Sequence, residues 1–199
     1  MRGFWIALGT VMLGALALAG CTSAPPTPPT EISITFQHRA PIALNVAKIE
    51  LVDRYQPTLR SPHVEHLHKV TPSTVTRSWI RERLRAVGAR GLITLIVEEA
   101  GVIEEPVGVS DGFEGLFRDE VDTRLVGVIR ARFDHVDVGP PGSSHSVEVI
   151  AEASAEVLES ATLNERDLAY FRLVERLAGE FDRVLTAEIE KSLASLIVQ

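Results

Sequence analysis

Two segments in the second half of the chain alternate between apolar and polar residues, as strands with one buried face do. In residues 124–134 the apolar face consists of Leu125, Gly127, Ile129, Ala131 and Phe133, and the other face carries Arg130 and Arg132. In residues 147–157 it consists of Val147, Val149, Ala151, Ala153 and Ala155, opposite Glu148, Glu152 and Glu156. A Gly-Pro-Pro-Gly turn lies between them at 139–142. We therefore predict an antiparallel hairpin in which the arginines face the glutamates across the strands.

Three further segments are predicted to be strands. Residues 32–36 alternate over a short length. The longer pattern of Ala43–Val52 changes phase near Ala47, which indicates a bulge in a first core strand. Residues 92–97 are almost all apolar and the pattern continues to Ile103, which is typical of a strand covered on both faces.

Residues 71–87 carry the signals of a helix. Thr71 is suited to the N-cap and Pro72 to the first helical position. Apolar residues then repeat at helical spacing, at Val75, Trp79, Ile80, Leu84 and Val87. The glycine at position 88 ends the pattern.

A second, longer helix is predicted from about Asn164 to Ile197. Its apolar residues trace one stripe, formed by Leu168, Phe171, Val174, Leu177, Phe181, Leu185, Ile189, Leu193 and Leu196. At 1.5 Å per residue such a helix is about 50 Å long, which is longer than a small sheet is wide. We therefore expect it to bend near Gly179 or to extend past the sheet.

This order of elements predicts an α+β fold. A strand, a helix, several strands and a long helix form a two-layer sandwich, with a mainly antiparallel sheet and both the short helix and the long C-terminal helix on one face. The 199 residues suit one hydrophobic core. We assign this domain to residues 32–199.

The first 20 residues have the pattern of a secretory signal peptide. Arg2 is followed by an apolar stretch from Phe4 to Leu18 and then by small residues. The alternative, an uncleaved membrane anchor, needs about 20 apolar residues with anchoring flanks on both sides. The sequence Leu18-Ala19-Gly20-Cys21 resembles the lipobox of bacterial lipoproteins. This resemblance implies that Cys21 is acylated and becomes the first residue of the mature protein.

Residues 21–31 are predicted to be a tether. Four prolines among them exclude a helix, and at about 3.1 Å per residue the extended segment reaches up to about 30 Å. Acyl chains contribute about 0.8 kcal/mol per buried methylene, so they hold the protein at a bilayer without further lipid contacts. Residue 22 is Thr and not Asp, which by the sorting rule of Gram-negative bacteria indicates the periplasmic face of the outer membrane, with the inner membrane as the alternative.

Composition and charge limit the possible functions. The formal charge of −7 argues against a nucleic-acid partner, which requires a dense basic surface. The single cysteine excludes an intramolecular disulfide and, once acylated, cannot act as a nucleophile. Ser143-Ser144-His145 lies next to the Pro-Gly turn, where such residues commonly bond the backbone. We therefore expect no enzymatic activity and no cofactor.

Histidines at positions 63, 66 and 68 are the candidate metal ligands. His66 and His68 share a face if the segment is extended, and His63 is close enough in sequence to join them. Glu65 lies among them. The alternative is a polar loop that packs against the first helix.

Two further groups are candidates for binding a partner. Arg77, Arg81 and Arg85 recur at successive helical turns and form a basic stripe, suited to lipid phosphates or an acidic protein; the alternative is the solvated side of an amphipathic helix. Phe113 and Phe117 lie in an acidic segment, where they cover either the domain's own sheet or a partner.

The lipobox, the proline-rich spacer and the order of elements in residues 32–199 together resemble small envelope lipoproteins. The resemblance is to the auxiliary lipoproteins of lipid-transport ABC systems and to the lipopolysaccharide-assembly lipoprotein LptE. It implies a non-catalytic periplasmic accessory, anchored to the membrane, that binds an envelope protein or a lipid. Two alternatives remain: a lipoprotein that binds a metal or small ligand through the histidine segment, and a hydrolase whose catalytic residues are dispersed along the sequence.

Overall fold

The predicted hairpin forms one half of the main sheet. In the computed structural model, which describes residues 33–107, 121–137 and 142–198, β5 (Val121–Asp137) pairs antiparallel with β6 (Ser143–Leu158). Every second residue of β5 from Thr123 to His135 is buried, as the alternating pattern predicts. The turn at 139–142 begins outside the described residues.

The other half of the sheet contains a crossover. The strand order is β2-β4-β5-β6, with β2 (Lys48–Asp53) parallel to the first part of β4 (Leu92–Pro106) and β4 antiparallel to β5. The register of β4 shifts between Val97 and Glu99. The predicted strand from residue 92 to 103 is therefore confirmed, and it is longer than predicted.

A second, two-stranded sheet joins distant parts of the chain. Strands β1 (Ile42–Leu44) and β3 (Leu84–Ala86) pair in parallel. The C-terminal residues complete this small sheet, because Leu44 bridges to Ile197 and the Val198 N–H donates to the Ala43 carbonyl at 2.9 Å.

Both helices begin with a capping box. In α1 (Pro72–Arg83) the Thr71 hydroxyl accepts from the Thr74 N–H, and Pro72 is the first residue, as predicted. In α2 (Leu163–Ser192) Thr162 and Glu165 satisfy each other's backbone N–H groups. A short 3-10 turn, η1 (Glu65–Leu67), precedes α1, and another, η3 (Ala194–Leu196), follows α2.

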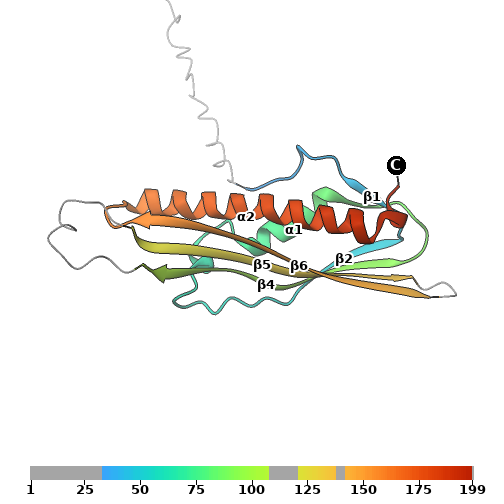
Figure 1. Ribbon diagram of the computed structural model, residues 1–199, viewed down its shortest axis with the longest axis horizontal. Helices are drawn as coiled ribbons and strands as arrows, with labels where there is room; N and C mark the ends of the chain where they lie inside the picture. Colours follow the sequence, from blue (N-terminus) through green and yellow to red (C-terminus); the bar gives the residue numbers. More distant parts are fainter. Residues whose placement is uncertain (1–32, 108–120, 138–141, 199) are drawn as a thin grey trace, which may run out of the picture. The chain divides into compact units, whose positions relative to one another are not determined.

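The helices cover one face of the main sheet (Figure 1). Trp79 of α1 and Phe181 of α2 meet edge to face, with ring centroids 5.7 Å apart. The α2 helix packs tightly on β5, because a Cβ added at Gly127 would lie 3.1 Å from a Leu177 methyl group. The chain is thus a mixed α+β protein with a long C-terminal helix, as the sequence predicts.

Four predictions of element bounds are wrong. The long helix ends at Ser192 and not at Ile197, which bridges to Leu44 instead. Residues 33–36 form no strand, because the Phe36 N–H donates at 2.6 Å to the Glu82 carboxylate instead of to a neighbouring strand. The predicted strand Ala43–Val52 is divided between β1 and β2, which belong to different sheets. The first helix ends at Arg83 and not at residue 87, since the next three residues pair with β1.

The long helix neither breaks at Gly179 nor needs to extend past the sheet. It continues through that residue as one element of 30 residues, which is about 45 Å long. The 17 residues of β5 span about 55 Å, so the strands are as long as the helix that lies along them (Figure 1). In the part of the chain that the structure describes, no helix is long and apolar enough to cross a bilayer.

Candidate functional site

Three of the predicted site residues cannot be placed. Cys21, Phe113 and Phe117 lie outside the described residues. The remaining candidates, three histidines and three arginines, lie in two places: the segment that runs along the edge of β4, and the helix α1 with the strand after it.

The three histidines do not converge on one point. The Nδ1 atom of His63 lies 3.7 Å from the carboxylate of Glu65, whereas the ring of His68 stacks on Tyr170 of α2 with centroids 3.5 Å apart. Among the described residues, nothing forms a hydrogen bond with the buried Nδ1 atom of His66. Over residues 33–107, 121–137 and 142–198, no group of three or more His, Cys, Asp or Glu side chains is placed to hold a metal ion. The geometry therefore gives the metal-binding alternative no support.

What organises this segment is the buried carboxylate of Glu65. Glu65 is 1% exposed, and its two carboxylate oxygens accept hydrogen bonds from different donors. The Tyr55 hydroxyl donates to Oε1 at 2.6 Å, and the Val102 N–H of β4 donates to Oε2 at 3.1 Å. The sequence does not identify Glu65 as a buried structural residue, because its local pattern does not distinguish such an acid from a metal ligand or a solvated acid.

Glu65 and its neighbours cover an edge of the sheet. Beyond residue 97, no strand of the described residues continues the pairing of β2 along β4. There the Val64 N–H donates to the Val102 carbonyl at 2.9 Å, and the Glu104 N–H donates to the Pro62 carbonyl at 2.8 Å. Backbone groups at a sheet edge that would otherwise be unpaired are thus satisfied by the protein's own chain.

The surroundings of this cluster shift the pKa values of two tyrosines and one histidine. Burial, followed by the hydrogen bond to Glu65, raises the pKa of Tyr55. Burial also raises the pKa of Tyr170, with a further contribution from Glu65. Burial lowers the pKa of His68, and Asp167 opposes this in part. Both tyrosines therefore stay protonated near neutral pH, and the hydrogen bonds of Tyr55 and Val102 to Glu65 serve a structural role.

The predicted basic stripe is only partly present. Arg77 lies 3.5 Å from Asp53 and Arg81 lies 3.0 Å from Glu82, so both are paired with acids at the surface. Arg85 is not on the helix at all, because it belongs to β3, although its guanidinium donates back to the Arg81 carbonyl at 2.7 Å. An unbroken row of free positive charge does not form.

The helix instead carries a buried arginine that the sequence analysis overlooked. Arg83 is 6% exposed and donates through Nε to Asp182 of α2 at 2.8 Å. Its terminal nitrogen also donates to the Thr186 hydroxyl. This arginine joins the two helices and is not available to a partner.

The face of the sheet that points away from the helices is lined by ion pairs. Arg130 lies 3.5 Å from Glu148, as the alternating pattern predicts, and Arg124 lies 3.5 Å from Glu156. Arg132 differs, because it pairs with Glu98 of β4 at 3.3 Å. Beside this face, a shallow groove of about 380 Å³ runs between β6 and α2, and it is lined by Ser154, Ala155, Glu156, Ala169, Arg172 and Arg176.

Comparison with known proteins finds similarity at the level of structure alone. No family model matches the sequence, and no curated protein matches it significantly. The rare lipoprotein B from Shewanella oneidensis is 10% identical, with coverage of 74% of this chain and 97% of that one and a TM-score of 0.39. A minor lipoprotein from Acinetobacter baumannii is 14% identical, with coverage of 78% and 98% and a TM-score of 0.36. A Xanthomonas campestris protein described by the family model DUF330 is 11% identical, with coverage of 75% and 88% and a TM-score of 0.36. Similarity at this level assigns no function to the chain.

Proposed function

We propose that this protein is a non-catalytic bacterial lipoprotein that acts as an accessory in envelope assembly or lipid transport. One observation carries the proposal: the lipobox Leu18-Ala19-Gly20-Cys21 and a proline-rich spacer come directly before the folded domain. Residues 32–199 form a compact unit of their own. A domain with its own core needs no lipid contact once acyl chains on Cys21 hold it at the bilayer.

The accessory role is supported by what the buried ionisable groups do. The carboxylate of Glu65 accepts from Tyr55 and Val102, and the carboxylate of Asp182 accepts from Trp79 and Arg83. These buried acids are engaged in holding elements together, whereas a catalytic acid or base must reach a reacting atom. The protein's open surfaces, the outer sheet face and the groove beside α2, suit recognition of a partner.

The anchor and its destination are tested together in the native host. Mass spectrometry of the mature protein should find diacylglyceryl on the sulfur of Cys21 and no leader. A Cys21→Ala variant should lose incorporation of labelled palmitate and keep the leader. Thr22→Asp, which restores the inner-membrane signal, should keep the acyl chains and move the protein from the outer to the inner membrane.

The accessory role itself is tested by crosslinking in intact cells, followed by purification of the tagged lipoprotein in detergent. Recovery of the same envelope protein or lipid with the wild type, and its loss with Cys21→Ala, is the expected result. A bare thiol at Cys21, or an intact leader before it, would overturn the anchor and the role that depends on it.

A further inference from the structure

The two long edges of the main sheet differ in whether other parts of the chain cover them. The edge of β4 beyond β2 is covered by residues 62–65 and the Glu65 carboxylate, as described above. The opposite edge is β6, a strand of 16 residues. All eight even-numbered residues of β6 from Ser144 to Leu158 are exposed. Proteins usually shorten or cover an edge of this length, because its unpaired backbone groups bind other strands.

The same even-numbered residues turn their backbone N–H and carbonyl groups away from β5. The Ser154 carbonyl shows this, because it accepts from the Arg176 side chain of α2, on the side opposite β5. Backbone groups alternate in direction along an antiparallel strand, so residues 144–156 repeat this orientation at every second position. Within the described residues, no backbone group of another segment pairs with them.

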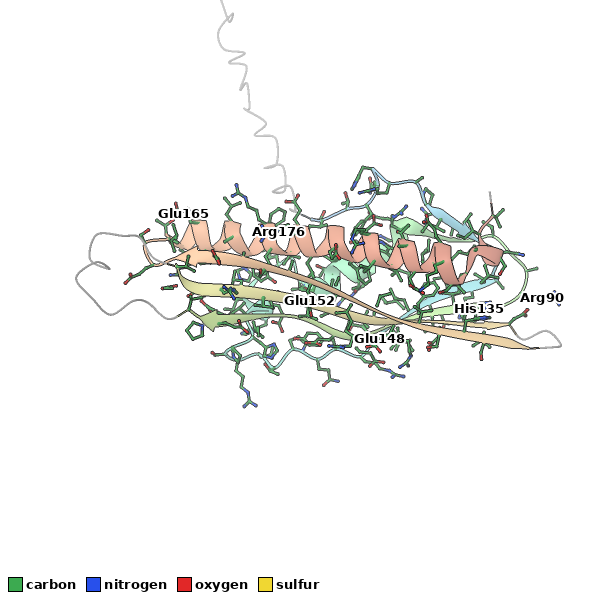
Figure 2. All side chains as sticks on the ribbon, viewed as in Figure 1. Arg90, His135, Glu148, Glu152, Glu165 and Arg176 are labelled. Atoms are coloured by element: carbon green, nitrogen blue, oxygen red, sulfur yellow. The ribbon has the colours of Figure 1, made fainter. Side chains whose placement is uncertain are left out.

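A groove lies directly beside this edge. Its lining residues include Ser154 and Glu156 of β6 and Arg172 and Arg176 of α2, and its volume is about 380 Å³. A strand added to β6 would point alternate side chains into this groove and onto the outer face of the sheet. Figure 2 shows Glu148 and Glu152 on the sheet and Arg176 on the helix above it.

We propose that the edge of β6 is a docking site for an extended segment of a partner protein, which adds to the main sheet as a fifth strand. The inference rests on the proposed role as a partner-binding protein but not on the acylation of Cys21. Recognition of this kind takes its affinity from backbone hydrogen bonds and its specificity from alternate side chains.

The charges on β6 and α2 define which partner segment fits this edge. On the outer face β6 presents Glu148, Glu152 and Glu156 at intervals of four residues. Glu148 and Glu156 also pair with Arg130 and Arg124, so Glu152 between them is the acid that a Lys or Arg of the added strand would meet. On the groove side it meets Arg172 and Arg176, so acidic or small polar residues fit there. A second copy of β6 is a poor occupant, because it would bring two rows of glutamates onto one sheet face.

The first test measures binding of a synthetic strand to the full chain in detergent. The probe is an alternating Lys-Thr peptide of about eight residues, the length of an ordinary strand plus its ends. The control peptide has Glu in place of Lys. We expect the Lys peptide to bind and to slow amide hydrogen exchange at the even-numbered residues of β6, because the odd-numbered amides already bond to β5. Equal binding of the two peptides, or protection elsewhere, would overturn the proposal.

Two variants make the test specific. Glu152→Pro removes an outward N–H without breaking a bond to β5, so binding should weaken by about tenfold or more, while the midpoint of thermal unfolding changes little. Glu152→Lys keeps the backbone N–H and introduces no proline. It should shift the binding preference from the Lys peptide toward the Glu peptide. Glu190→Lys, on the exposed side of α2, is the matched control for charge and should shift nothing.

The remaining outcomes each decide against the proposal. A dimer in solution that Glu152→Pro dissociates would make a second copy the occupant. Binding to anionic vesicles that Arg172→Ala and Arg176→Ala abolish, with no peptide binding, would make the groove a site for lipid headgroups. Acylation of Cys21 with no peptide binding would leave the proposed function standing and remove only this docking site.

Discussion

The carboxylate of Asp182 on α2 accepts a hydrogen bond of 2.8 Å from the indole nitrogen of Trp79 on α1. The same oxygen accepts from Nε of Arg83 at 2.8 Å, and both charged residues are buried. The other carboxylate oxygen lies 3.7 Å from the exposed Arg39. The two helices are therefore joined by a buried ion pair in addition to their apolar contact.

Removing Asp182 should be costly, because it leaves the charge of Arg83 buried without compensation. We expect Asp182→Ala to lower the free energy of unfolding by about 3–5 kcal/mol, measured by urea denaturation. Glu180→Ala removes a partly exposed acid that pairs with Arg183 of the same helix and should cost no more than about 0.5 kcal/mol. Similar losses in the two variants would show that burial adds nothing to the Asp182 interaction.

Substitution of two glycines by alanine should change the free energy of unfolding in opposite directions. At Gly101 a Cβ would lie 2.7 Å from the Tyr55 hydroxyl, so Gly101→Ala must displace the donor of Glu65. The expected loss is about 1–3 kcal/mol, with faster proteolysis between residues 54 and 62. At Gly179, which is inside a helix, an added Cβ would meet no described atom within 4 Å outside the neighbouring helix backbone, so Gly179→Ala should gain about 0.5–1 kcal/mol. A stabilising Gly101→Ala would mean that the tyrosine moves without cost.

The histidines should make the protein less stable in acid. Burial lowers the pKa of His68 and of His135 in the folded state, so the unfolded chain binds more protons as the pH falls below about 6.5. The free energy of unfolding should therefore decrease between about pH 7 and pH 5. His68→Phe keeps a ring against Tyr170 and should reduce this dependence, whereas an unchanged pH profile would place its origin elsewhere.

The N-cap of α1 offers a local test. Thr71→Ala removes the hydroxyl that accepts from the Thr74 N–H and should cost about 1 kcal/mol. Thr71→Ser keeps the oxygen and should restore most of the loss. If both variants lose the same amount, the methyl group of Thr71 and not its hydrogen bond stabilises the helix.

The elements that the sequence predicts well are those whose signals are local. The alternation of β5 and β6 follows from burial of one face, and Thr71 and Pro72 mark the start of α1 through their own chemistry. The end of α1 was missed because Leu84 continues the helical spacing and yet pairs with Ile42, from far along the chain. A long-range pairing of this kind overrides a local preference and leaves no trace in the pattern.

The candidate sites divide in the same way. His63, His66 and His68 are close in sequence, but η1 and the Tyr170 stack direct their rings to different neighbours. Glu65 and Arg83 are buried only because Tyr55, Val102 and Asp182 supply partners from other elements. The free edge of β6 could not be found from sequence, since it depends on the strand order of the whole sheet.

The small sheet has a mechanical consequence for a protein held by its N-terminus. Tension from an anchored Cys21 would enter the domain ahead of Ile42, where β1 is bound both to β3 and to Val198 near the other end of the chain. The C-terminal residues would thus share the load on β1 with β3 before the main sheet is strained. Loss of residues 196–198 would remove these contacts, so the domain would begin to unfold at its tethered end.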